Sequence, residues 1–276
     1  MKAALLQITS SDDPAANARV AGALVARAAS AGAGFVLTPE VTNCVSTSRS
    51  HQTEVLRPEA EDVTLATLRE AAAKHGVWVL AGSLALRSEP PETRFANRSI
   101  LIDPEGEISA RYDKAHMFDV QVSEQETYRE SAGFAPGDRA VTAETPFGTL
   151  GLSICYDLRF PYLYRRLAQA GATILTVPSA FSTATGPLHW EPLLRARAIE
   201  TGSYVLAPAQ VGIHAATRGK PRKTHGHTLA VSPWGEVLLD AGTEPGVHLV
   251  EIDPDAAQEA RAKVPSLSHD REVSGP

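Results

Sequence analysis

Residues 146–161 read Pro146-Phe-Gly-Thr-Leu-Gly-Leu-Ser-Ile-Cys-Tyr-Asp-Leu-Arg-Phe-Pro161. In the first half, leucine and isoleucine alternate with small residues, which predicts a β-strand that packs closely in a sheet. After Cys155 the residues become polar, and Pro161 precedes a stretch with helical periodicity. The segment therefore predicts a strand that delivers Cys155 to a turn just before a helix.

Cys155 is a candidate nucleophile. A thiol at a strand-to-helix turn is held rigidly, and the nearby backbone N–H groups and helix N-terminus favour the thiolate. Such a position suits attack on a carbonyl carbon. Alternatively, Cys155 is a small buried residue of the core, because free cysteine is among the most buried residue types.

The composition limits the classes of function. The chain has 276 residues, of which 43% are hydrophobic and 21% charged, as in ordinary soluble globular proteins. A net charge of −6 and the lack of a long Lys/Arg block argue against a nucleic-acid binder. The two cysteines have no metal-ligand spacing, and no apolar run has membrane-spanning length. The first residues run directly into an expected strand, so we expect no signal peptide. We expect a cytoplasmic protein without a metal or membrane partner.

Strands and helices alternate along the chain, which predicts an α/β protein with helices outside a mixed sheet system. No linker divides it, so we expect one domain over residues 1–264 and a tail over 265–276, frayed or docked on a partner subunit. Residues 212–226 are expected to form a polar loop. The expected strands are 2–8, 35–40, 77–82, 94–102, 108–112, 172–178, 203–210, 229–232, 236–240 and 246–252, and the expected helices are 17–31, 61–75, the segment after 161, and 189–201.

Three ionisable residues directly follow apolar strands: Glu40, Lys114 and Cys155. Strand ends of an open α/β sheet form the crevice where ligands bind, so we expect the three side chains to converge. Taken singly, Glu40 and Lys114 could each be solvated surface residues.

Together these residues suit amide hydrolysis. A carboxylate can take the proton of the thiol and return it to a departing amine. The attack makes an oxyanion, which an ammonium and the backbone N–H of Tyr156 can stabilise. Collapse leaves a thioester that water hydrolyses, so the chemistry needs no cofactor.

Four motifs carry a resemblance to the nitrilase superfamily of carbon–nitrogen hydrolases. They are Pro39-Glu40, Arg111-Tyr-Asp-Lys114-Ala-His-Met-Phe-Asp119, Ile154-Cys155-Tyr-Asp-Leu-Arg-Phe-Pro161, and Gly186-Pro-Leu-His-Trp-Glu-Pro-Leu-Leu-Arg-Ala-Arg-Ala-Ile-Glu200. The resemblance implies a four-layer α-β-β-α sandwich, a Glu40–Lys114–Cys155 triad, and pairing into a homodimer or higher homo-oligomer. It also implies a second glutamate beside the lysine, for which Glu130 matches best and Glu124 and Glu126 are competitors.

The sequence Cys155-Tyr-Asp157 resembles the amidase branches of the superfamily more than the true nitrilases. The stretches 178–190 and 226–235 are similar to Nit-type amidases, which comprise deaminated glutathione amidase and ω-amidase, and the stretch after Ala207 looks closer to the former. The resemblance implies a small carboxylated amide as substrate. An N-carbamoyl amino acid amidohydrolase, a catalytically silent binding relative, and a redox sensor pairing Cys155 with Cys44 remain alternatives.

A carboxylated substrate needs a cation, and Arg159 stands four residues after the nucleophile. Alternatively, Arg159 pairs with Asp157 or a helix end. The resemblance suggests that Phe181 and Thr185 line the substrate pocket, although Phe181 could equally belong to the core and Thr185 could cap a helix.

Further polar residues lie outside the triad and its substrate pocket. His116 is expected to be structural. Lys220, Arg222 and Lys223 either meet a second carboxylate of a larger substrate or are solvated. Two features depart from the family pattern: Val41 replaces a polar residue, and the tail lacks a basic-aromatic ending.

Overall fold

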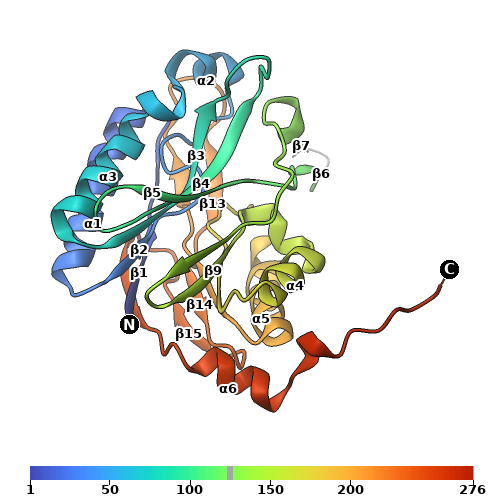
Figure 1. Cartoon of the computed structure of the whole chain (residues 1–276). Coiled ribbons are helices and arrows are strands. Elements are labelled where there is room, and N and C mark those ends of the chain that lie inside the picture. Colours follow the sequence, from blue (N-terminus) through green and yellow to red (C-terminus); the bar gives the residue numbers. More distant parts are fainter. Residues whose placement is uncertain (123–126, 276) are drawn as a thin grey trace.

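Two six-stranded sheets lie face to face between two layers of helices (Figure 1). The computed structural model describes residues 1–122 and 127–275. In spatial order, the first sheet consists of β16 (Gly246–Glu251), β1 (Lys2–Gln7), β2 (Phe35–Leu37), β3 (Trp78–Arg87), β4 (Phe95–Ile102) and β5 (Ile108–Asp113). The second sheet consists of β15 (Val237–Asp240), β14 (Leu229–Val231), β11 (Tyr204–Ala207), β10 (Ile174–Thr176), β9 (Gly148–Leu152) and β8 (Thr142–Thr145).

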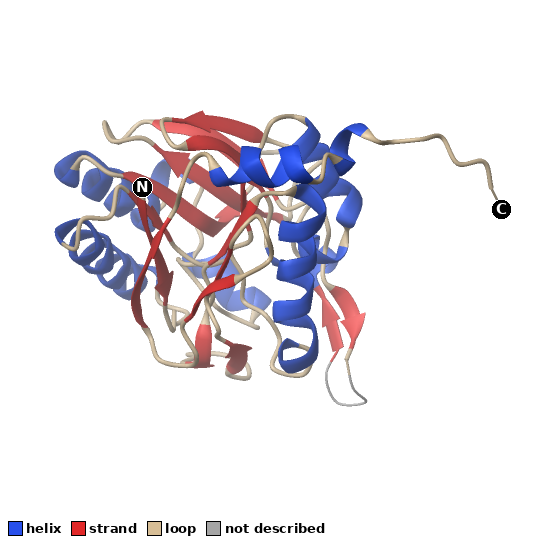
Figure 2. Cartoon of the chain, turned by 90° about the horizontal axis from the view of Figure 1, so that it is seen from below, coloured by secondary structure: helices blue, strands red, loops and turns tan. Residues whose placement is uncertain are grey.

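The helices form the outer layers, and Figure 2 shows them on both sides of the strands. Helices α1 (Pro14–Ser30) and α3 (Val63–His75) cover the first sheet, whereas α4 (Pro161–Gln169) and α5 (Gly186–Thr201) cover the second. The carboxylates of Asp13 and Asp62 accept bonds from backbone N–H groups in the first turns of α1 and α3. The predicted four-layer α-β-β-α sandwich is confirmed.

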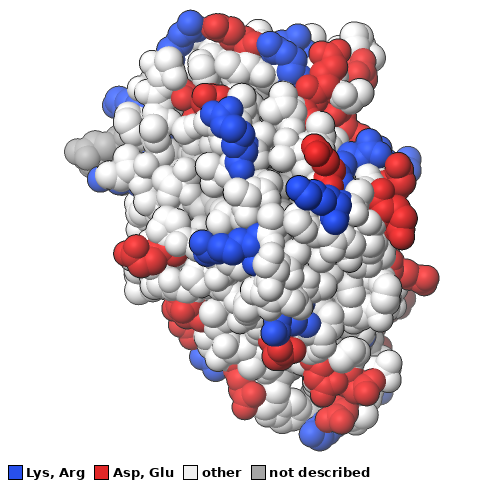
Figure 3. All heavy atoms as spheres, turned by 90° about the vertical axis from the view of Figure 1, so that its left-hand side faces the viewer, with Lys and Arg blue, Asp and Glu red and all other residues white. Residues whose placement is uncertain are grey.

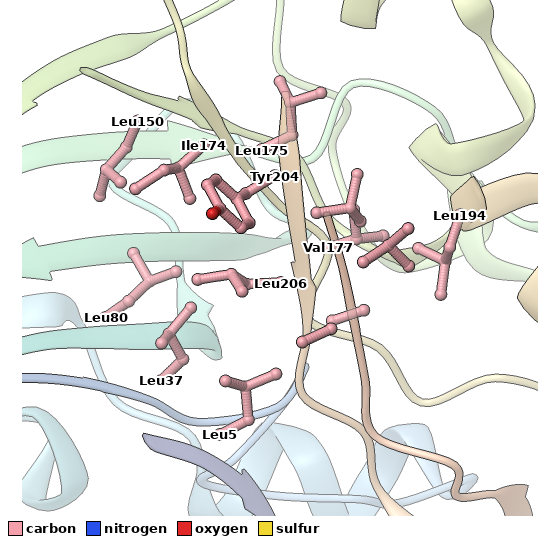
Figure 4. Packing of buried hydrophobic residues seen from close by; sticks show 14 of the residues in the cluster. Leu5, Leu37, Leu80, Leu150, Ile174, Leu175, Val177, Leu194, Tyr204 and Leu206 are labelled. Atoms are coloured by element: carbon pink, nitrogen blue, oxygen red, sulfur yellow. The ribbon is translucent and has the colours of Figure 1, made fainter. Parts of the chain in front are cut away.

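The first sheet buries both faces, because successive side chains of a strand point to opposite sides. Leu5, Leu37 and Leu80 point toward the second sheet, where they meet Leu206 and other residues of its strands (Figure 4). The intervening side chains, such as Val36, pack against α1 and α3. Full burial of each such side chain is worth about 1.5–3 kcal/mol, so this alternation fixes the order of the layers.

Some elements differ from the sequence-based expectation. Part of the expected polar loop 212–226 forms the antiparallel hairpin β12 (Val211–His214) and β13 (Arg222–His225). Helix α5 begins three residues before the expected start, because Pro187 suits its first turn. Four further short elements were not anticipated: α2 (Arg49–Val55), β6 (Asp119–Gln121), β7 (Thr127–Arg129) and β8 (Thr142–Thr145).

The C-terminal region contains a helix that the sequence analysis did not predict, α6 (Ala256–Lys263). The expected tail then docks on α4 of its own chain. Arg165 donates to the carbonyl of Ser266 at 2.9 Å, and Gln169 donates to that of Leu267 at 3.1 Å. The division into residues 1–264 and 265–276 stays a prediction.

The face formed by α1 and α3 carries basic and acidic side chains interspersed, without a continuous patch of either sign (Figure 3). Among the described residues, no helix is long and apolar enough to cross a bilayer.

Candidate active site

Glu40, Lys114 and Cys155 meet at one end of the two sheets. Glu40 lies three residues after β2, Lys114 directly follows β5, and Cys155 follows β9 and begins a 3-10 turn over Cys155–Arg159. All three line one cavity of about 300 Å³. The expected convergence therefore occurs, but it uses both sheets, because Cys155 belongs to the second sheet and the other two residues to the first.

The Lys114 ammonium lies between two carboxylates. Its Nζ is 2.9 Å from Oε1 of Glu40 and 2.9 Å from both carboxylate oxygens of Glu130. Burial disfavours the charged amine, but the two negative charges outweigh it and raise the pKa of Lys114. Lys114 is therefore an ammonium at neutral pH. Glu130 is thus the glutamate that the structure brings to the lysine, while Glu124 and Glu126 lie outside the described residues.

The Glu40 carboxylate is buried and held from three sides. Besides Lys114, it accepts bonds from Asn97 Nδ2 at 2.9 Å and from the backbone N–H of Ala180 at 2.8 Å. Burial opposes ionisation, but the charges of Lys114 and Arg222 outweigh it and lower the pKa of Glu40. Glu40 is therefore an ionised acceptor whose charge acts on the Cys155 thiol in the same cavity.

Asn97 is a site residue that the sequence analysis missed. Its Nδ2 also reaches Glu130 Oε1 at 3.3 Å, so it bridges the two carboxylates that hold Lys114. It lies within β4, and it is buried. The available signal was an amide inside an expected strand, because an amide that a sheet buries must find hydrogen-bond partners.

Cys155 has a strained backbone, with φ of +47°, a region that non-glycine residues rarely occupy. Burial and the negative charge of Glu40 raise the pKa of its thiol. The expectation that the turn favours a thiolate is therefore wrong for the free protein, because burial and Glu40 outweigh the neighbouring positive charges. Tyr156 also lines the cavity and occupies the first turn of the 3-10 segment, where helical N–H groups lack an intrahelical acceptor.

Asp157 ties the cysteine turn to the lysine loop. Its carboxylate accepts bonds from Tyr112 Oη at 2.7 Å, Ile154 N at 2.8 Å, His116 N at 3.0 Å and His116 Nδ1 at 2.6 Å. The His116 ring also stacks on Phe160, with 3.6 Å between ring centroids. These contacts fit the structural role predicted for His116.

Phe181 and Thr185 both line the cavity. Phe181 also packs on Trp190, with ring centroids 4.9 Å apart, so it belongs to the core as well as to the cavity wall. Thr185 makes no side-chain capping bond to α5, and its Oγ1 is buried without a hydrogen-bond partner among the described residues. The helix-cap alternative is thus not realised.

Arg159 lies outside the set of residues that line the cavity. Its guanidinium contacts His189 Nδ1 at 3.1 Å and lies over the rings of Tyr156 and Phe181. The structure therefore does not bring Arg159 to the cavity. The cations that do line it are Lys114 and three arginines, Arg49, Arg129 and Arg222. The sequence analysis named Arg222 among the loop residues that either meet a second carboxylate or are solvated.

The rest of the cavity wall comes from the segment after Glu40. It includes Val41, which is buried with φ of +47°, and Cys44, whose pKa burial and nearby aspartates raise to about 12. Both cysteines are free. Within residues 1–122 and 127–275, no group of three or more His, Cys, Asp or Glu side chains could hold a metal ion.

Comparison with known proteins assigns the family. A sequence model described as Carbon-nitrogen hydrolase matches residues 2–262. The chain is 42% identical over 272 residues to a protein of Synechocystis sp. named deaminated glutathione amidase, with 97% of each chain covered.

Solved structures share the fold. The NitFhit protein of C. elegans superposes with a TM-score of 0.89 at 35% identity, and the match covers 98% of this chain but only 65% of that one. The amidase of Nesterenkonia sp. AN1, in a form described as carrying acrylamide added to its active-site cysteine, gives 0.77 at 28% identity, covering 96% of this chain and 98% of that one. By its sequence and its fold, the chain belongs to the carbon–nitrogen hydrolase family.

Proposed function

We propose that the chain is an amidase that hydrolyses the C–N bond of a small carboxylated amide through a thioester on Cys155, with deaminated glutathione as the substrate. The observation that carries this proposal is the cavity in which Cys155 shares space with the paired Glu40 and Lys114. The name of the Synechocystis relative supports the choice of substrate. A cytoplasmic location and a homo-oligomeric state stay predictions.

In the acylation half, Glu40 takes the thiol proton as the sulfur attacks the amide carbon. The negative oxygen that forms is stabilised by the Lys114 ammonium and the backbone N–H of Tyr156. The C–N bond then breaks, the nitrogen leaves with the proton that Glu40 returns, and the acyl group stays on sulfur. Glu130 and Asn97 are positioning residues, because their contacts hold Lys114 and Glu40 in place.

In the hydrolysis half, Glu40 takes a proton from water, and the oxygen attacks the thioester carbon. The same two donors stabilise the second oxyanion. The C–S bond breaks, the carboxylic acid leaves, and the sulfur recovers its proton from Glu40. Glu40 thus acts twice as base and twice as acid, which requires one carboxylate within reach of Cys155.

The test is a panel of amides: deaminated glutathione, the open-chain keto acid amides of glutamine and asparagine, and N-carbamoyl amino acids. We expect release of the amine from deaminated glutathione, and a trapped acyl-enzyme should add its mass to Cys155. Cys155→Ala should fold normally and lose turnover. Turnover retained in this variant, or carbon dioxide released with ammonia from carbamoyl compounds alone, would contradict the assignment.

A further inference from the structure

Arg222 is fixed at the wall of the cavity by the β12–β13 hairpin. A bridge between Ser182 and Thr224 joins this hairpin to the loop that carries Phe181, and Arg222 Nη2 donates to the Ala180 carbonyl at 2.6 Å. The backbone N–H of Ala180 in turn binds Glu40. The guanidinium is therefore held by the same loop that positions the Glu40 carboxylate.

Three polar atoms of the cavity wall are buried without partners. They are Arg222 Nε, Thr185 Oγ1 and Asn97 Oδ1, which form no hydrogen bond within the described part of the chain. A buried polar group left unpaired costs about 1–3 kcal/mol, so native proteins seldom leave several beside one cavity. All three residues line the cavity that contains Cys155, which indicates that a bound molecule supplies the missing partners.

Arg222 also differs in its charge partners from Arg98, which is likewise partly buried. Arg98 pairs with carboxylates of Glu59 and Asp113 at 2.9 and 2.7 Å. None of the described carboxylates lies within ion-pair distance of Arg222. Arg222 lines the same cavity as Glu40 and Cys155, and its positive charge favours the ionised form of both groups.

We propose that Arg222, together with the Thr185 hydroxyl, binds a carboxylate of the substrate a few bonds from the scissile carbonyl. Guanidinium suits this role, because its planar array of donors matches a carboxylate. Arg159 contacts His189 and lies over the rings of Tyr156 and Phe181, so it is the rival cation for this role. The inference rests on the proposed amidase function, and it names Arg222 as the residue that selects carboxylated amides over neutral ones.

The test separates binding from turnover. In a Cys155→Ala background, calorimetry compares glutaramate with pentanamide, which have the same chain length and differ in the terminal carboxylate. We expect glutaramate to bind about ten- to a hundredfold more tightly, the range of a charge-assisted hydrogen bond. Arg222→Gln, which removes the positive charge, should abolish this preference, and Arg222→Lys should keep part of it.

Two control variants distinguish Arg222 from its cationic neighbours. Lys223→Gln removes a positive charge from the adjacent, exposed position of β13, and Arg159→Gln tests the rival cation. Both should retain the preference for glutaramate. The proposal is overturned if Arg222→Gln keeps the preference, if Arg159→Gln loses it, or if glutaramate binds no better than pentanamide. Absence of amide turnover by the unmodified protein would instead contradict the amidase function.

Discussion

Replacing Asp157 with Asn should destabilise the protein and misplace the active site. Each carboxylate oxygen of Asp157 accepts two bonds: one from Tyr112 and Ile154, the other from both donors of His116. An Asn side chain has only one oxygen, so its NH₂ group must face one of these pairs. The tyrosine hydroxyl can rotate and the imidazole can change tautomer, but the backbone N–H of Ile154 or His116 cannot become an acceptor.

The expected loss in the free energy of unfolding follows from the number of hydrogen bonds that Asp157→Asn removes. At least one backbone donor loses a bond to a charged acceptor and meets another donor in a fully buried place. Such losses amount to about 2–4 kcal/mol, a large part of a typical free energy of unfolding. Ile154 precedes Cys155 and His116 lies two residues after Lys114, so kcat should also fall, by about a hundredfold for a displacement near 1 Å.

Urea unfolding measures the effect as a lower midpoint at unchanged slope. Asp119→Asn is the matched control, because Asp119 makes the same kind of bond to Ser131 N, at 3.0 Å, on an exposed surface. It should change the free energy of unfolding by no more than about 0.5 kcal/mol. If Asp157→Asn were as stable as this control, the network would not hold the two segments together.

Three further outcomes are expected. Glu40→Gln should lower the pKa of Cys155, because it removes the negative charge beside the thiol, and the pH dependence of alkylation measures this pKa. Turnover should nevertheless fall about 10²–10⁴-fold, because the general base is lost. Turnover equal to that of the unmodified protein would refute the assignment of Glu40 as the base. Burial lowers the pKa of His214 to about 4 from its ordinary 6.5, so the unfolded state binds more protons than the folded state between these pH values. The contribution of His214 to the free energy of unfolding should be complete above pH 6.5 and decrease toward pH 4, by at most about 3 kcal/mol. Urea titrations of His214→Gln should show a weaker dependence of stability on pH. Gly76→Ala should cost about 1–2 kcal/mol in thermal unfolding, because Gly76 ends α3 at φ of +63°, whereas Gly34→Ala, where a Cβ meets nothing within 4 Å and φ is ordinary, should be nearly neutral.

The sequence predicts the parts of the site that strand ends supply. Glu40, Lys114 and Cys155 each follow an apolar run, and the alternation of those runs places each residue at the margin of a sheet. The pattern could not predict that two sheets share the site. An apolar strand indicates that both of its faces are buried, but not to which sheet the strand belongs.

The sequence did not predict the residues whose positions depend on strand pairing or on the orientation of a turn. Asn97 lies inside β4, and the hydrophobic pattern of this strand does not show which groups its amide would bond. Arg222 reaches the cavity because the polar loop folds back as a hairpin, with Arg222 opposite His214. Arg159 ends the 3-10 turn, and the orientation of that turn directs it toward α5 and His189 instead of the cavity.

The charges of the site explain why the thiol is protonated at rest. Lys114 balances one of the two carboxylates that contact it, and Arg222 offsets part of the remaining negative charge. Ionising Cys155 would add a further buried anion beside Glu40, which is why its pKa is raised. Proton transfer to Glu40 must therefore accompany bond formation to the substrate carbon, when the new negative charge appears on oxygen near Lys114 and Tyr156. In this arrangement Cys155 becomes reactive when an amide occupies the cavity, and a substrate carboxylate on Arg222 would hold the amide there.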